Sequence, residues 1–102
     1  MEITLLYFEG CPNWREAEGR LRRALEALGQ PASVLVLRRV EAPEDAERLA
    51  FRGSPTILVN GVDPFADPMA PIGLACRVYR SGDGSDTAPT VSQLIQALTA
   101  AR

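Results

Sequence analysis

The first 40 residues combine an apolar run, an amphipathic segment and a second apolar run, and this order constrains the fold more than any other feature. Residues 3–8 carry no charge, which predicts a strand that is buried on both faces. Residues 12–28 place apolar side chains at helical spacing and are followed by Gly29, which predicts a helix and its end. Residues 33–40 predict a second strand. Together they predict a βαβ unit with parallel strands.

Shorter elements are expected in the rest of the chain. They are a short helix at 41–52, a third strand at 56–59, a proline-containing loop at 62–73, a fourth strand at 74–79 that runs antiparallel to the third, and polar turns at 81–89. Gly53 is expected to end the short helix, and Asn60 with Gly61 forms a turn dipeptide after the third strand. Thr90 and Gln93 have the spacing of a capping box, which predicts a last helix.

The bulk composition limits the class of protein. A chain of 102 residues suffices for a single domain, residues 1–102, with one core. A net charge of −2 provides no electrostatic attraction to nucleic acid or to an anionic membrane, so neither is expected as a partner. No basic leader precedes the first strand, and no apolar run approaches about 18 residues. We therefore expect a cytoplasmic protein.

The histidine and cysteine counts narrow the chemistry further. The chain has no His, which excludes a His-activated nucleophile and a Cys/His zinc site. Two Cys in a chain expected to be cytoplasmic do not indicate a disulfide framework.

Charged side chains in the predicted loops and on the predicted helix have simple interpretations. The spacing of four loop aspartates matches no calcium loop, so they are expected to be solvated and no metal site is expected: Asp63, Asp67, Asp83 and Asp86. Arg20, Arg22 and Arg23 are expected to form a solvated helix face that pairs with nearby glutamates.

Cys11 lies at the predicted turn between the first strand and the first helix. The free N–H groups and the positive dipole end of a helix N-terminus stabilise a thiolate, so the position predicts a reactive thiol. The alternative is a small buried residue at a helix start.

Two short motifs lie within the order βαβαββα. Gly10-Cys11-Pro12-Asn13-Trp14 stands where the thioredoxin superfamily has Cys-x-x-Cys, and Arg52-Gly53-Ser54-Pro55-Thr56 resembles that family's cis-proline stretch. On these motifs and their order, nearly the whole chain resembles the thioredoxin superfamily. The resemblance implies a three-layer α/β/α fold around a central mixed four-stranded sheet.

The resemblance also implies roles for individual residues. Cys11 matches the family's nucleophile, and the Ser54–Pro55 bond is expected to be cis, with Pro55 against Cys11. Ser54 is expected to offer backbone groups to an extended peptide or to glutathione. Pro12 and Trp14 are expected to border the same substrate site, although Trp14 is also expected to pack under the helix.

The main departure from the family is Trp14, which stands where the second, resolving Cys would be. A protein with only the first Cys can form a mixed disulfide with glutathione or with a partner protein, but it cannot release that partner by local attack. The sequence therefore predicts dependence on an external thiol.

Cys76 is the other candidate for a resolving thiol. In the family topology the fourth strand lies beyond the third, which places Cys76 roughly 10 Å or more from Cys11. A disulfide needs Cα atoms within about 7 Å, so a buried strand cysteine is the favoured interpretation. A Cys11–Cys76 pair stays open, because the proline-containing loop could displace the strand.

The leading functional hypothesis is thiol–disulfide exchange through a mixed disulfide on Cys11. Its partner would be a thiol or disulfide of a protein or a small molecule, with glutathione as a co-substrate and no bound cofactor. One alternative is a non-catalytic thioredoxin-fold binding module. Another is a protein that handles soft metals or organomercurials, because thiolates bind soft cations.

Overall fold

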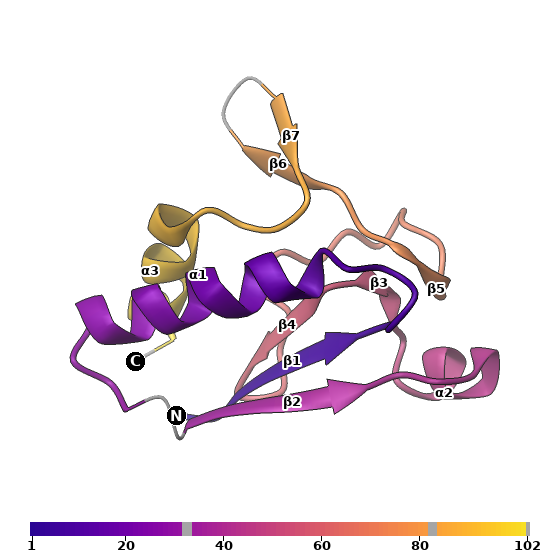
Figure 1. The fold of residues 1–102 in the computed structure, drawn as a ribbon, viewed down its shortest axis with the longest axis horizontal. Helices are drawn as coiled ribbons and strands as arrows, with labels where there is room; N and C mark the ends of the chain where they lie inside the picture. Colours follow the sequence, from indigo (N-terminus) through magenta and orange to yellow (C-terminus); the bar gives the residue numbers. More distant parts are fainter. Residues whose placement is uncertain (32–33, 82–83, 102) are drawn as a thin grey trace.

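The computed structural model describes residues 1–31, 34–81 and 84–101, and these form an α/β fold with a mixed sheet and three helices (Figure 1). In the central sheet, β1 (Ile3–Tyr7) lies between β2 (Leu35–Arg39), which is parallel to it, and β4 (Thr56–Val59), which is antiparallel. Helix α1 (Trp14–Ala27) connects β1 to β2. The predicted βαβ unit is confirmed.

The boundaries of this unit differ slightly from the predicted ones. Helix α1 begins at Trp14 rather than at residue 12, because Asn13 occupies the N-cap. The predicted start of the second strand, Ser33, lies outside the described residues. Strand β2 is mostly exposed, although its sequence is rich in apolar residues.

The alternation of side chains along β1 divides the core in two. Ile3 and Leu5 point to the face that is covered by α1 and α3 (Val91–Ala100), where they pack against a row of buried α1 side chains. That row consists of Ala17, Leu21, Ala24 and Leu25. The capping box is confirmed, since Thr90 and Gln93 each accept a hydrogen bond from the other's backbone N–H.

Leu6 points to the opposite face and packs with Val40, Ala46 and Phe51. Ala46 belongs to α2 (Pro43–Arg48), which is shorter than predicted. The prediction that Gly53 ends this helix is wrong: Ala50 takes the left-handed conformation, with φ of 52°. Phe51 is fully buried in the cluster, and its burial accounts for the chain leaving the helix before residue 52.

Strand β5 (Gly73–Cys76) pairs parallel with β3 (Arg52–Ser54), an element that the sequence analysis did not predict. The expected antiparallel pairing of the fourth strand with β4 is wrong, and the central sheet has three strands instead of four. The loop between β4 and β5 is long enough for the crossover that a parallel pair requires. Gly53 permits this pairing, since a Cβ there would lie 2.9 Å from the Arg77 Cβ.

Strands β6 (Tyr79–Ser81) and β7 (Gly84–Asp86) form a hairpin that projects from the body of the fold (Figure 1). The sequence predicted a strand that ends at residue 79 and polar turns at 81–89, and Asp83 lies outside the described residues. Within the parts of the chain that the structure describes, no helix has the length and apolar character needed to cross a membrane.

Candidate functional site

Cys11 and Cys76 are joined by a disulfide, with Cα atoms 5.6 Å apart and a sequence separation of 65. Cys11 lies between β1 and α1, and Cys76 is the last residue of β5. The favoured interpretation of Cys76 as a buried cysteine remote from Cys11 is therefore wrong, and the open alternative of a Cys11–Cys76 pair describes the structure.

Ser54 explains why the two cysteines meet. It is the register partner of Cys76 across the β3–β5 pair. Its hydroxyl also accepts a hydrogen bond of 3.0 Å from the Phe8 N–H, three residues before Cys11. Ser54 thus holds the end of β5 beside the end of β1. The predicted separation of roughly 10 Å or more is wrong because the strand that carries Cys76 pairs with β3 and does not lie beyond β4.

The backbone around Ser54 has the predicted cis conformation, but its polar groups are not accessible to a peptide or to glutathione as predicted. The Ser54–Pro55 bond is cis, as predicted. Ser54 is fully buried, its carbonyl oxygen accepts a hydrogen bond of 2.9 Å from the Arg77 N–H, and the same oxygen lies 3.7 Å from the Cys11 Sγ. The strand edge that was expected to receive a peptide is covered by β5 in this structure.

The two bonded cysteines differ in exposure. Cys11 is 1% exposed, whereas Cys76 is exposed. The sequence had predicted the opposite, with Cys11 in an open turn and Cys76 inside the sheet. Pro12, directly after Cys11, is exposed. The side chain of Asn13 makes no capping hydrogen bond, and the Arg15 N–H in the first turn of α1 is bonded to the Pro12 carbonyl instead.

Trp14, at the first position of α1, packs against Tyr7 without being buried. Its ring stacks on Tyr7, with centroids 4.4 Å apart, and the guanidinium of Arg15 lies 4.8 Å from the Trp14 centroid. The indole is half-buried, so it covers the end of β1 and still presents surface to solvent.

Arg77 is the residue that sequence reasoning missed. It is 7% exposed and donates hydrogen bonds to the Asp63 carboxylate at 2.7 Å, the Thr56 hydroxyl at 3.3 Å and the Phe65 carbonyl. The expectation that Asp63 is merely solvated is wrong, because it forms this ion pair. One signal was present in the sequence: a lone Arg inside an apolar strand pattern needs a buried acidic partner.

Tyr79 packs against Arg77 beside the cis Ser54–Pro55 bond. It is 4% exposed, and its hydroxyl donates a hydrogen bond to the Pro55 carbonyl. Burial raises the pKa of the Tyr79 phenol well above its usual range; Asp63 adds to the shift and Arg77 opposes it. The guanidinium of Arg77 lies 4.5 Å from the Tyr79 ring centroid.

A hollow of about 950 Å³ opens between the loop that precedes β5 and the strands β5 and β6. Cys76 lines this hollow and Cys11 does not. The charged residues that line it are Arg52, Arg77, Arg80 and Asp67.

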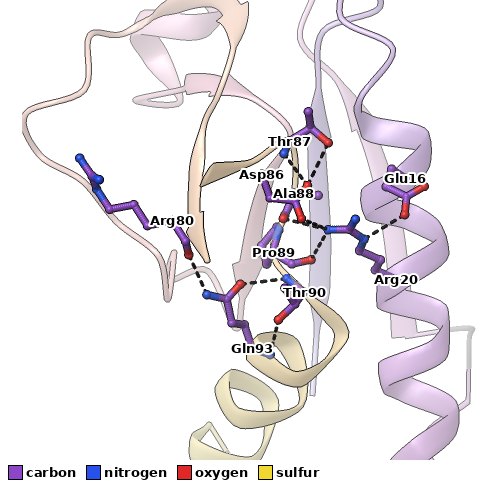
Figure 2. Close-up of polar contacts among 9 residues, drawn as sticks. All are labelled: Glu16, Arg20, Arg80, Asp86, Thr87, Ala88, Pro89, Thr90 and Gln93. Carbon is purple, nitrogen blue, oxygen red and sulfur yellow. Dashed lines mark hydrogen bonds and ion pairs between the residues drawn. The ribbon is translucent and has the colours of Figure 1, made fainter. Parts of the chain in front are cut away.

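Asp86 also has a partner that the sequence did not predict. Arg20 bonds to Glu16 as expected, but it also reaches across to Asp86 at 3.1 Å and to the carbonyls of Ala88 and Pro89 (Figure 2). The described residues contain no cluster of three or more His, Cys, Asp or Glu side chains that could hold a metal ion.

Comparison with protein-family models, with curated proteins and with solved structures found no match. A disulfide with one buried and one exposed cysteine, which borders a hollow, is suited to attack by an external thiol from the exposed side.

Proposed function

We propose that this protein carries out thiol–disulfide exchange, cycling between a Cys11–Cys76 disulfide and two thiols. The observation that carries the proposal is the pairing itself. Two cysteines far apart in sequence meet with Cα atoms 5.6 Å apart, and one of them is exposed. An external thiol needs access of this kind to reach a disulfide.

The surroundings of Cys11 support the proposal. Cys11 lies three residues before α1 begins at Trp14, near the helix N-terminus, where backbone N–H groups and the helix dipole stabilise a thiolate once the disulfide is reduced. A Cys11 thiol could also donate a hydrogen bond to the Ser54 carbonyl, which lies 3.7 Å from its sulfur. After reduction, the helix N-terminus would stabilise the Cys11 thiolate, and the Ser54 carbonyl would accept a hydrogen bond from the Cys11 thiol.

The thioredoxin resemblance supports the same activity. The βαβ unit, Cys11 before the helix and the cis Ser54–Pro55 bond all follow that family's pattern. We propose a thioredoxin-like arrangement in which Cys76, from a different strand, supplies the second sulfur that Trp14 replaces in the motif. External thiols would then reduce the pair, with glutathione as the co-substrate and the cytoplasm as the location.

The test is the redox equilibrium of the cysteine pair in glutathione buffers of graded potential. Thiol-exchange proteins have midpoints from about −120 to −270 mV, and structural disulfides lie below about −300 mV. We expect a midpoint in the exchange range, together with catalysed reduction of a small disulfide substrate. A midpoint below about −300 mV without turnover would assign the bond a structural role, which also fits a non-catalytic binding module.

The closeness of the two sulfurs also favours a second candidate function, the handling of soft metals. After reduction, Cys11 and Cys76 place two thiols where one soft cation could bridge them. The test is titration of reduced protein with Hg²⁺. One equivalent bound to the wild type, and markedly weaker binding to both Cys11→Ser and Cys76→Ser, would support this function. Equal binding to a single-cysteine variant would contradict it.

A further inference from the structure

We propose that Cys76, and not Cys11, is the sulfur that bonds to the partner, and that the hollow beside Cys76 binds a small thiol or disulfide carrying negative charge. This inference rests on the proposed thiol–disulfide exchange and gives it a direction and a substrate class. It reverses the roles that the sequence motif implies, in which Cys11 forms the mixed disulfide.

The difference in exposure between the two cysteines identifies Cys76 as the sulfur that bonds to the partner. Cys11 is 1% exposed and lies under the Ser54 carbonyl, whereas Cys76 is exposed and lines the hollow. An attacking thiolate must approach one sulfur of the disulfide along the direction of the S–S bond, and Cys76 is the exposed residue of the pair.

Reduction of the disulfide proceeds in two exchange steps. A partner thiolate RS⁻ attacks the Cys76 Sγ, the bond to Cys11 breaks, and its electron pair leaves on Cys11 as a thiolate. A second RS⁻ attacks the partner sulfur of the mixed disulfide and releases RSSR and the Cys76 thiolate. Both protein thiolates take up the protons that the two RSH molecules lost. In the reverse direction Cys76 is the nucleophile and Cys11 resolves the mixed disulfide.

The charged residues that line the hollow favour a partner that carries negative charge. Arg77 is neutralised by Asp63, and Arg52 donates to the Ala70 carbonyl while keeping its positive charge. Arg80 is exposed, and its side chain extends away from α3 (Figure 2).

The lining therefore has an excess of positive charge. Arg52 and Arg80 outweigh Asp67, whose carboxylate caps the Met69 N–H. The volume of about 950 Å³ lies within the range of small-molecule sites, so a small carboxylate-bearing thiol fits both the size and the charge.

The first experiment maps the mixed disulfide. Oxidised protein is mixed with glutathione, quenched with acid at early times, alkylated and analysed by peptide mass spectrometry. We expect glutathione on Cys76 and the alkyl group on Cys11. Glutathione on Cys11 would overturn the inference and leave the proposed function intact. Absence of a mixed disulfide on either cysteine would contradict the proposed function itself.

Single-cysteine variants check the same point without rearrangement between the two sulfurs. We expect Cys11→Ser, which retains Cys76, to react with oxidised glutathione at least about tenfold faster than Cys76→Ser, because access limits the rate. Circular dichroism confirms that both variants are folded. Equal rates, or faster reaction of Cys76→Ser, would overturn the assignment of Cys76.

The charge of the partner is tested with Arg80→Glu and a matched control, Arg23→Glu, which makes the same charge change at an exposed site on α1. We expect Arg80→Glu to slow reduction by glutathione about fivefold or more at low salt. We expect reduction by the neutral thiol 2-mercaptoethanol to be unchanged. An equal effect of both variants, or an equal effect on both thiols, would overturn the anionic substrate class.

Discussion

The guanidinium of Arg77 donates a hydrogen bond of 2.7 Å to the carboxylate of Asp63, in a place where the Arg77 side chain is only 5% exposed. The ion pair connects the residue after Cys76 to the loop that leads into β5. Burying the two charges costs hydration energy, which offsets most of the attraction between them. The pair therefore fixes the position of the loop relative to β5 more than it adds to the stability of the fold. Removing one partner of the pair destabilises the fold, because the other charge is then buried without a counter-ion.

Replacing Asp63 by Asn leaves Arg77 buried without a counter-ion. We expect a loss of about 3 kcal/mol in the free energy of unfolding, near the low end for buried pairs because Asp63 is partly exposed. Urea denaturation of the oxidised protein measures it. Asp67→Asn is the control, because it removes a carboxylate from the same loop that meets only a backbone N–H. If both variants lose the same small amount, the burial of Arg77 does not matter energetically.

Removal of the Tyr79 hydroxyl by Tyr79→Phe leaves the buried Pro55 carbonyl without its donor. We expect a loss of about 1–2 kcal/mol in stability, as for other buried carbonyl groups left unpaired. Tyr7→Phe serves as the control, since Tyr7 acts through the stacking of its ring on Trp14. Unchanged stability of Tyr79→Phe would show that the hydrogen bond contributes nothing.

The same phenol makes stability depend on alkaline pH. Burial raises the pKa of Tyr79, so the folded state favours the neutral phenol more than the unfolded state does. Its contribution is complete below the ordinary tyrosine pKa of about 10 and is lost as the pH rises through the folded value. We expect the stability difference between wild type and Tyr79→Phe to narrow as the pH rises above about 10. A constant difference across that range would contradict the shift.

Arg20 ties α1 to the segment before α3 (Figure 2), and Arg20→Ala removes donors from the Ala88 and Pro89 carbonyls at once. We expect a loss of about 2 kcal/mol, as for hydrogen bonds to a charged donor. Arg22→Ala, which removes a pair with Glu18 on the exposed side of the same helix, should cost about 0.5 kcal/mol or less. Thermal or urea unfolding compares the two, and equal losses would contradict the bridging role of Arg20.

The pKa of Asp86 depends on its interaction with Arg20 and can be measured at acid pH. The hydrogen bond from Arg20, aided by the Thr87 N–H, lowers the pKa of the Asp86 carboxyl below its ordinary value of 3.8. A lowered pKa stabilises the fold above 3.8 and loses that effect as the pH falls through the folded value. We expect an NMR titration to show a higher Asp86 pKa in Arg20→Met than in the wild type. Identical titration curves would remove Arg20 as the cause.

The sequence by itself determined the local elements. Residue periodicity predicts α1, β1 and β2, and the hydrogen-bonding groups of Thr90 and Gln93 suffice to place the start of α3. The prediction that the Ser54–Pro55 bond is cis is also confirmed, although it came from the family resemblance. Helix periodicity and caps depend on neighbours within a few residues, so they can be read from the chain itself.

The site was decided by tertiary structure. Cys76 meets Cys11 because β5 pairs with β3 rather than with β4, and strand partnership depends on where a long loop returns the chain. The same pairing buries Arg77 against Asp63 and exposes Cys76 at the hollow. No local pattern specifies such a choice, because the gain from burying Phe51 and pairing β3 with β5 appears only after distant segments have packed together.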